Sequence, residues 1–89
     1  HGTSAVANAQ QTIVFLGLTF MNFGRAIKLV RTQRNMSQAD LASRAGLSVS
    51  YVSMLERGQR DPNLTSIEKI ASALEIPVSI LMFLAAEPE

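Results

Sequence analysis

The sequence predicts a small all-α domain made of five short helices. Three observations favour this fold class: apolar residues recur at helical spacing, capping residues precede several of these segments, and no segment requires a β-strand. The chain has 89 residues, 47% of them hydrophobic and 17% charged, which is enough for one compact domain. A domain this small buries only about 60–65% of its unfolded surface, so a second subunit could add stability.

Residues 1–20 form an N-terminal extension ahead of the well-patterned part of the chain. The first eleven residues are small and polar, and we expect them to be mobile. Residues 12–20 are strongly apolar, but they are too few to cross a bilayer, and the basic region of a signal peptide is missing. We expect natural translation to start at Met21, so that residues 1–20 come from an upstream reading frame or a vector. Alternatively, residues 12–20 form a strand or helix that covers an apolar surface.

The domain itself is predicted to span residues 21–85, and its first helix to cover about Asn22 to Arg34. Phe23, Ile27 and Val30 share one face of this helix, with Ala26 beside them. Its basic residues lie largely on the other faces: Arg25, Lys28 and Arg31. We therefore expect the apolar face to pack against the rest of the domain.

Two short helical patterns follow and meet at Gly46. The first begins at Ser37, and Asp40 stands three residues later, as in a capping box. Gly46 has no Cβ, so it can adopt the left-handed conformation that ends one helix and redirects the chain. Ala42 falls where two steeply crossing helices would touch, and its small side chain permits a close approach. This pattern predicts a helix-turn-helix, a motif that places its second helix in a DNA major groove.

The second helix of the motif is predicted to follow Ser48 as its N-cap, with Gly58 after its end. The residues expected to point inward are Leu47, Val52 and Leu55. The outward positions are candidates for base contacts: Val49, Ser50, Ser53 and Met54. The two serines can donate or accept hydrogen bonds, whereas Val49 and Met54 offer only apolar contact, best suited to thymine methyl groups. Because this face has no Arg, Asn or Gln, we expect weak direct readout and a contribution from DNA shape; the alternative is a merely solvated face.

Contacts to DNA phosphates are expected from residues that flank this helix. Gln38 starts the preceding helix, where its amide and backbone N–H can both reach a phosphate. Further candidates are Tyr51, Arg57 and Arg60. Arg44 lies on the outer face of the preceding helix and is either a phosphate ligand or a solubilising charge.

Arg31 and Glu56 each follow a residue predicted to be buried. One interpretation is a partly covered ion pair that joins the first helix to the recognition helix and fixes its orientation. The alternative is that both are free surface charges. A buried pair would in any case be weak evidence for net stability.

A fourth helix is predicted to start at a second capping box, Thr65 to Glu68, and to run through Leu74. Its expected inward residues are Leu64, Ile67, Ile70, Ala71 and Leu74. Pro77 then precedes a fifth helix from Val78 to about Ala85, which is followed by the acidic tail, residues 86–89.

The fifth helix has more apolar residues than one buried stripe needs. We therefore predict a homodimer interface formed by Ile76, Val78, Ile80, Leu81, Phe83 and Leu84. The alternative is that this helix simply closes the core against Phe20 or Phe23.

The formal net charge is only +1, but it is unevenly distributed. Residues 21–62 hold seven basic and three acidic residues, whereas residues 63–89 hold one basic and four acidic residues. The first part could face phosphates while the second avoids them.

The chain has no cysteine and one histidine, at position 1. Disulfides and metal sites built from thiolates or histidines therefore have no support, and the cytoplasm is the expected compartment. No catalytic constellation or phosphate-binding glycine loop is evident, so we expect no enzyme activity, cofactor or metal.

Four motifs together resemble the phage-repressor-type helix-turn-helix regulators, which include Cro, lambdoid repressors and the controller proteins of restriction–modification systems. They are R-x-x-R-N-M-S-Q-A-D-L-A from Arg31, G-L-S-x-S-Y-V-S from Gly46, L-E-R-G-Q-R-x-P from Leu55 and L-x-x-I-x-x-I-A-x-A-L from Leu64. The resemblance implies a lambda-repressor-like five-helix domain that binds operator DNA as a dimer. It also implies that Gln38 contacts phosphate, that the four outward residues named above face bases, and that Arg31 pairs with Glu56. The chain departs from the family at Val49 and Met54, where members often have Gln, Arg or Lys.

We therefore expect a cytoplasmic, homodimeric regulator that binds a pseudo-palindromic operator in double-stranded DNA, with no membrane partner and no small-molecule effector. Its activity would depend on its own concentration. The alternative function is a protein-interaction module on the same fold, such as an antitoxin or a coactivator-like domain.

Overall fold

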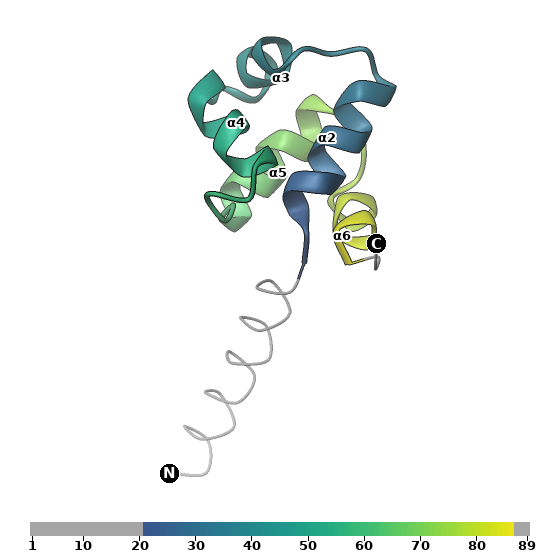
Figure 1. Cartoon of the computed structure of the whole chain (residues 1–89). Coiled ribbons are helices and arrows are strands. Elements are labelled where there is room, and N and C mark those ends of the chain that lie inside the picture. The colour runs from purple at the N-terminus through teal and green to yellow at the C-terminus, as the bar shows by residue number, and fades with distance from the viewer. Residues whose placement is uncertain (1–20, 87–89) are drawn as a thin grey trace, which may run out of the picture.

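The computed structural model describes residues 21–86, and these form five helices and no strand. The helices are α2 (Phe23–Gln33), α3 (Gln38–Ala45), α4 (Val49–Glu56), α5 (Leu64–Ala73) and α6 (Val78–Ala86). Figure 1 shows α3 and α4 on one side of the domain and α6 on the other, beside the N-terminal half of α2. The predicted all-α class is confirmed. The expectations for residues 1–20 and 87–89 lie outside the described residues.

Serine caps begin both helices of the helix-turn-helix, as the sequence predicts. The Ser37 Oγ accepts a hydrogen bond from the Asp40 backbone N–H (2.9 Å), and Asp40 Oδ2 accepts one from the Ser37 N–H (3.0 Å). The Ser48 Oγ accepts from the Tyr51 N–H at 3.0 Å. These bonds satisfy N–H groups that would otherwise lack a helical partner.

Gly46 ends α3 in the left-handed conformation, with φ = +68°. A Cβ at this position would meet no atom within 4 Å, so the need for glycine is conformational rather than steric. The next N–H, that of Leu47, bonds to the Ala42 carbonyl oxygen at 2.9 Å and closes the turn. The predicted joint is therefore confirmed.

The start of α5 differs from the prediction. Its N-cap is Asn63, whose Oδ1 accepts a hydrogen bond from the Ser66 N–H at 2.8 Å, and Thr65 lies inside the first turn. Asparagine is a stronger N-cap than threonine, which favours the earlier start, although the Thr65–Glu68 spacing matches a capping box. Leu64 becomes the first helical residue and is 60% exposed, which corrects the expectation that it points inward.

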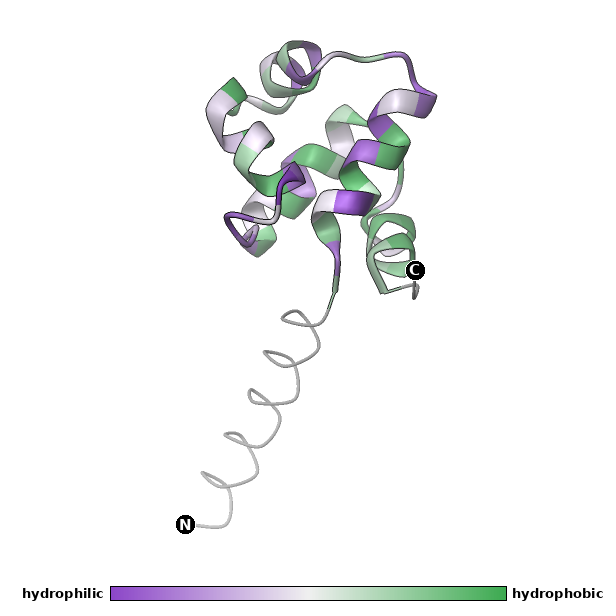
Figure 2. Ribbon diagram, in the orientation of Figure 1, coloured by the Kyte–Doolittle hydropathy of each residue, from purple (hydrophilic) through white to green (hydrophobic). Residues whose placement is uncertain are grey.

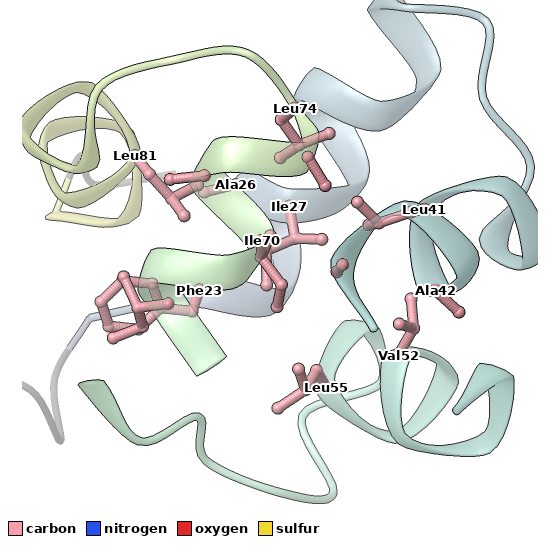
Figure 3. Close-up of a cluster of buried hydrophobic side chains, with 14 of the residues drawn as sticks. Phe23, Ala26, Ile27, Leu41, Ala42, Val52, Leu55, Ile70, Leu74 and Leu81 are labelled. Carbon is pink, nitrogen blue, oxygen red and sulfur yellow. The ribbon is translucent and has the colours of Figure 1, made fainter. Parts of the chain in front are cut away.

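The core lies where all five helices meet. Figure 3 shows side chains from α2, α3, α4, α5 and α6 converging on Ile27 and Ile70. Ala42, on α3, is fully buried, as expected if its small side chain lies where two helices cross closely. Val30 and Leu47 are half-buried at the margin of this core.

Helix α6 both closes the core and leaves apolar side chains exposed. Leu81 and Ala85 are buried, whereas Ile80 and Phe83 are exposed. The Asn22 N–H bonds to the Ala85 carbonyl oxygen at 2.8 Å, and Arg25 Nη2 donates to the Leu84 carbonyl oxygen at 3.0 Å. The C-terminal end of α6 is thus attached to the N-terminal end of α2.

No single helix within residues 21–86 is long and apolar enough to cross a membrane. Helices α5 and α6 together have the length and apolar composition of a membrane-spanning segment, but the pair is bent by 108°.

The capping box of Ser37 and Asp40 is expected to make the domain less stable at acidic pH. The hydrogen bonds from Ser37 lower the pKa of the Asp40 carboxyl below its ordinary value. A carboxyl whose pKa is lower in the folded state stabilises the fold above its unfolded pKa of about 3.9, and this stabilisation is lost as the pH falls through the folded pKa. We expect Asp40→Asn to lower the melting temperature at pH 7 and to have a smaller effect at pH 2–3, measured by circular dichroism. Asp61→Asn makes the same charge change in an exposed loop and should leave the melting temperature at pH 7 nearly unchanged.

Candidate nucleic-acid interface

The outer face of α4 contains the four residues predicted to contact bases. Val49 is 46% exposed and Ser50 is exposed, while Ser53 and Met54 are half-buried. On the opposite face, Val52 and Leu55 are fully buried in the core. The helix is therefore anchored by one face and presents a short, nearly uncharged surface on the other.

Arg31 and Glu56 form the ion pair that the sequence suggested as one of two possibilities. Arg31 Nε and Nη2 donate to the two carboxylate oxygens of Glu56 at 2.6 and 3.0 Å, and the two side chains are only 11% and 3% exposed. The hydrogen bond to Glu56 raises the pKa of the Arg31 guanidinium, and desolvation opposes this effect. A two-point contact of this kind sets the direction of both side chains and so joins α2 rigidly to the end of α4.

The same carboxylate also holds the start of α3. Gln38 Nε2 donates to Glu56 Oε1 at 3.1 Å, and Arg31 Nη1 donates to the Met36 carbonyl oxygen at 2.8 Å. One amide hydrogen of Gln38 is used by this bond, and the amide group has a second donor. The network therefore orients Gln38, a predicted phosphate contact, relative to α4.

Gly24 permits a close approach that sequence reasoning missed. A Cβ on Gly24 would lie 2.4 Å from the Leu55 carbonyl oxygen and 2.9 Å from that of Glu56. Helix α2 therefore packs directly on the backbone at the C-terminal end of α4. The only sequence signal was a glycine in the first turn of an amphipathic helix, where glycine is less favourable than alanine and calls for a packing reason.

Tyr51 connects α4 to α5 and to the loop between them. Its hydroxyl lies 3.0 Å from the Ser66 Oγ, and the Arg60 guanidinium carbon lies 5.9 Å from the centre of its ring. Ser66 is a buried polar residue that sequence reasoning also missed, although a serine beside Ile67 on an inward face was a visible signal. The tyrosine hydroxyl, predicted to bind phosphate, thus has a partner within the domain, and the ring supports Arg60.

The remaining basic residues near α4 are accessible. Arg57 and Arg60 are exposed in the segment after α4, and the Arg57 Nε donates to the Ser53 carbonyl oxygen at 3.4 Å. Arg44 is exposed on α3. Figure 2 shows this segment after α4 as strongly hydrophilic, in contrast to α6, which is mostly hydrophobic.

The predicted dimer residues divide into two groups. Leu81 is 0% exposed and lies in the core of its own protomer, so it is not available to a partner and its assignment to the interface was wrong. Ile76, Val78 and Leu84 are half-buried against the same core, and Ile80 and Phe83 are exposed.

A shallow groove runs between α2 and α6 and is lined by Leu29, Val30, Gln33, Arg34 and Leu84. Leu29 is an exposed apolar residue that sequence reasoning missed, because it lies off the inward stripe of α2. We call the exposed apolar residues of these two helices the α2–α6 surface: Leu29 on α2, and Ile80 and Phe83 on α6. Among residues 21–86 there is no group of three or more His, Cys, Asp or Glu residues that could hold a metal ion.

Comparisons with known proteins agree with this geometry. A helix-turn-helix family model matches residues 27–81. The immunity repressor protein of Bacillus phage phi105 is 40% identical over 62 residues, which are 70% of this chain and 43% of the repressor. The regulator SinR of Bacillus subtilis (strain 168) is 35% identical over 60 residues, or 66% of this chain and 54% of SinR. The chain thus matches about half the length of these two relatives.

Solved structures show the same fold. The restriction-modification controller protein C.AhdI from Aeromonas hydrophila superposes with a TM-score of 0.67 and 41% identity, covering 71% of this chain and 96% of C.AhdI. The wild-type controller protein C.Esp1396I gives a TM-score of 0.68 with 29% identity, covering 74% of this chain and 86% of C.Esp1396I. These matches confirm the resemblance to phage-repressor-type regulators. The chain belongs to the helix-turn-helix family, and the relatives named here are repressors, transcriptional regulators and controller proteins.

Proposed function

We propose that this protein is a non-enzymatic transcriptional regulator of the cytoplasm that binds a pseudo-palindromic operator in double-stranded DNA as a homodimer. The observation that carries this proposal is the outer face of α4, which is accessible, rigidly anchored and flanked by basic residues. An anchored second helix of this kind is the element that enters the major groove in helix-turn-helix proteins.

The proposed complex uses two classes of contact. Val49, Ser50, Ser53 and Met54 face base edges. The phosphates are contacted by Gln38, Tyr51, Arg57 and Arg60. Phosphate contacts position the protein without specifying sequence, whereas base contacts distinguish one operator from another. Binding to a site that overlaps a promoter would repress transcription, and binding upstream of it could activate.

Dimerisation is supported by the α2–α6 surface. Phe83 is 54% exposed and Ile80 46% exposed on α6, and Leu29, which is 41% exposed on α2, lines the groove between the two helices. Two copies joined across such a surface by a two-fold axis could present two α4 helices to successive major grooves about 34 Å apart.

The first experiment separates base contacts from phosphate contacts. We expect Ser50→Ala combined with Ser53→Ala to reduce the preference for a selected operator over random DNA by about 1 kcal/mol or more. Arg57→Ala combined with Arg60→Ala should weaken binding to both DNAs. Because a homodimer then loses four phosphate contacts, the slope of log K against log salt should fall by about 3–4. Fluorescence anisotropy at several salt concentrations measures both effects. Uniform, purely salt-driven binding of the wild type to every sequence would refute specific operator binding.

The second experiment tests the dimer. Phe83→Asp places a carboxylate on the α2–α6 surface, and we expect it to weaken self-association tenfold or more because an unpaired charge is costly to bury. Leu64→Asp is the matched control, since Leu64 is also exposed but lies at the start of α5. Sedimentation of the full chain over a range of concentrations gives the dissociation constants. Equal self-association of the two variants would contradict this assignment of the interface.

A protein-interaction module is the second candidate, and the exposed α2–α6 surface favours it. Such a module would use this surface for a different protein and would be indifferent to Ser50→Ala and Ser53→Ala. The first experiment therefore also decides between the two functions.

A further inference from the structure

We propose that Val49 makes α4 a detector of the C5-methyl group of pyrimidines, so that the protein favours thymine and 5-methylcytosine over uracil and cytosine at one position of each half-site. This proposal rests on the proposed DNA-binding function and specifies what the recognition helix distinguishes.

The first argument is the absence of available charge on α4. The only charged residue of Val49–Glu56 is Glu56, and its carboxylate is 3% exposed and paired with Arg31. The Tyr51 hydroxyl is within hydrogen-bonding distance of Ser66. The polar groups left on the outer face are the Ser50 and Ser53 hydroxyls.

Hydroxyl groups give only modest discrimination between bases. Each can donate to a base acceptor or accept from a base donor, so a serine contact is compatible with more than one base pair and contributes less preference than a bidentate contact. Strong discrimination usually comes from bidentate arginine, lysine, asparagine or glutamine contacts, and α4 contains none of these residues. The helix therefore needs another source of base specificity.

Val49 can supply base specificity through an apolar contact. It is the first residue of α4, directly after the Ser48 cap, and N-terminal residues of a recognition helix are those that contact base edges. Its side chain is 46% exposed and consists only of a branched hydrocarbon. The one apolar group that natural bases present in the major groove is the C5-methyl of thymine. Methylation places the same group on cytosine, and contact of Val49 with either methyl removes apolar surface from water.

Met54 is the competing apolar residue on this face. It lies five residues along the helix and is half-buried, so less of its side chain is available. We therefore assign the methyl contact to Val49 and use Met54 as the comparison in the test.

The test begins with selection of a preferred duplex from a random pool by the full chain. Each thymine of the selected half-site is then replaced by uracil, which removes the methyl group and leaves the hydrogen-bonding groups unchanged. We expect one thymine at which this change weakens binding about fourfold per half-site, as for one buried methyl group. At the same position, a 5-methylcytosine·guanine pair should bind more tightly than a cytosine·guanine pair by a similar factor.

Variants assign the effect to a residue. In Val49→Ala the thymine and uracil duplexes should bind almost equally, whereas Met54→Ala should keep the difference. Val49 is exposed, so its truncation should leave the fold intact, and the circular dichroism melting curve checks this. Equal binding of thymine and uracil duplexes by the wild type, with sequence preference retained, would overturn the methyl proposal and leave operator binding standing. Loss of the uracil effect in Met54→Ala but not in Val49→Ala would overturn the assignment to Val49, and failure to select any sequence would overturn the proposed function itself.

Discussion

Replacing Arg31 by alanine is expected to reduce the free energy of unfolding by about 3–5 kcal/mol, because it leaves the Glu56 carboxylate buried without its cation. Glu56 is 3% exposed and would keep only the hydrogen bond from the Gln38 amide among those described above. The substitution also removes the bond from Arg31 to the Met36 carbonyl oxygen, which holds the chain between α2 and α3. A loss of this size is a large fraction of the stability of a small domain, which is roughly 5–15 kcal/mol.

Urea denaturation followed by circular dichroism measures this effect. Arg34→Ala is the matched control, since Arg34 is an exposed arginine at the end of the same helix and donates one hydrogen bond to the Glu75 carbonyl oxygen. We expect it to cost about 1 kcal/mol or less. The double variant Arg31→Met with Glu56→Leu should recover most of the lost stability, because no unpaired charge remains. Equal costs for Arg31→Ala and Arg34→Ala would show that the ion pair does not hold the domain together.

Gly24→Ala is expected to destabilise the domain by about 1–3 kcal/mol, although the same change in an exposed helix would stabilise it by about 1 kcal/mol. The sign is reversed because the new Cβ would lie 2.4 Å from the Leu55 carbonyl oxygen. That oxygen belongs to the backbone of α4 and cannot move aside as a flexible side chain could. The helices must separate, and the direction of the recognition helix changes with them.

The control for this prediction is Thr32→Ala, an exposed position of α2 where alanine gains helix propensity without meeting another element. It should leave stability unchanged or raise it. Denaturation curves give the stabilities, and amide chemical shifts of Leu55 and Glu56 report displacement of α4. A Gly24→Ala variant as stable as the wild type, with unchanged shifts at these two amides, would contradict the close packing.

The local features of the fold were predictable because their causes lie within a few residues of sequence. The bonds between Ser37 and Asp40 span one turn, and the left-handed conformation at Gly46 requires only the absence of a Cβ. The start of α5 was missed for a related reason. Asn63 is the stronger cap by residue type, whereas the spacing of Thr65 and Glu68 matches a capping box, so two local signals indicate different starts.

Part of the candidate interface was also predictable. The outward positions of α4 follow from helical periodicity once Val52 and Leu55 are taken as inward. The roles of Tyr51 and Ser66 did not follow, because their contact joins residues 15 positions apart across two helices. The sequence also left open whether Arg31 and Glu56, 25 positions apart, were paired or free.

The sequence by itself determined the all-α class, the order of the helices, the turn at Gly46 and the outer face of α4, since periodicity and capping act within single elements. Only the tertiary structure decided which side chains of α6 are buried and how closely α2 approaches α4. Leu81 and Phe83 are both large and apolar, but two residues on a helix are separated by about 200°, so one faces the core while the other faces solvent. The need for glycine at position 24 was also decided by the tertiary structure. It arises from the carbonyl oxygen of Leu55, which is 31 positions away in the sequence. Such contacts depend on the relative placement of whole helices, which no local pattern specifies.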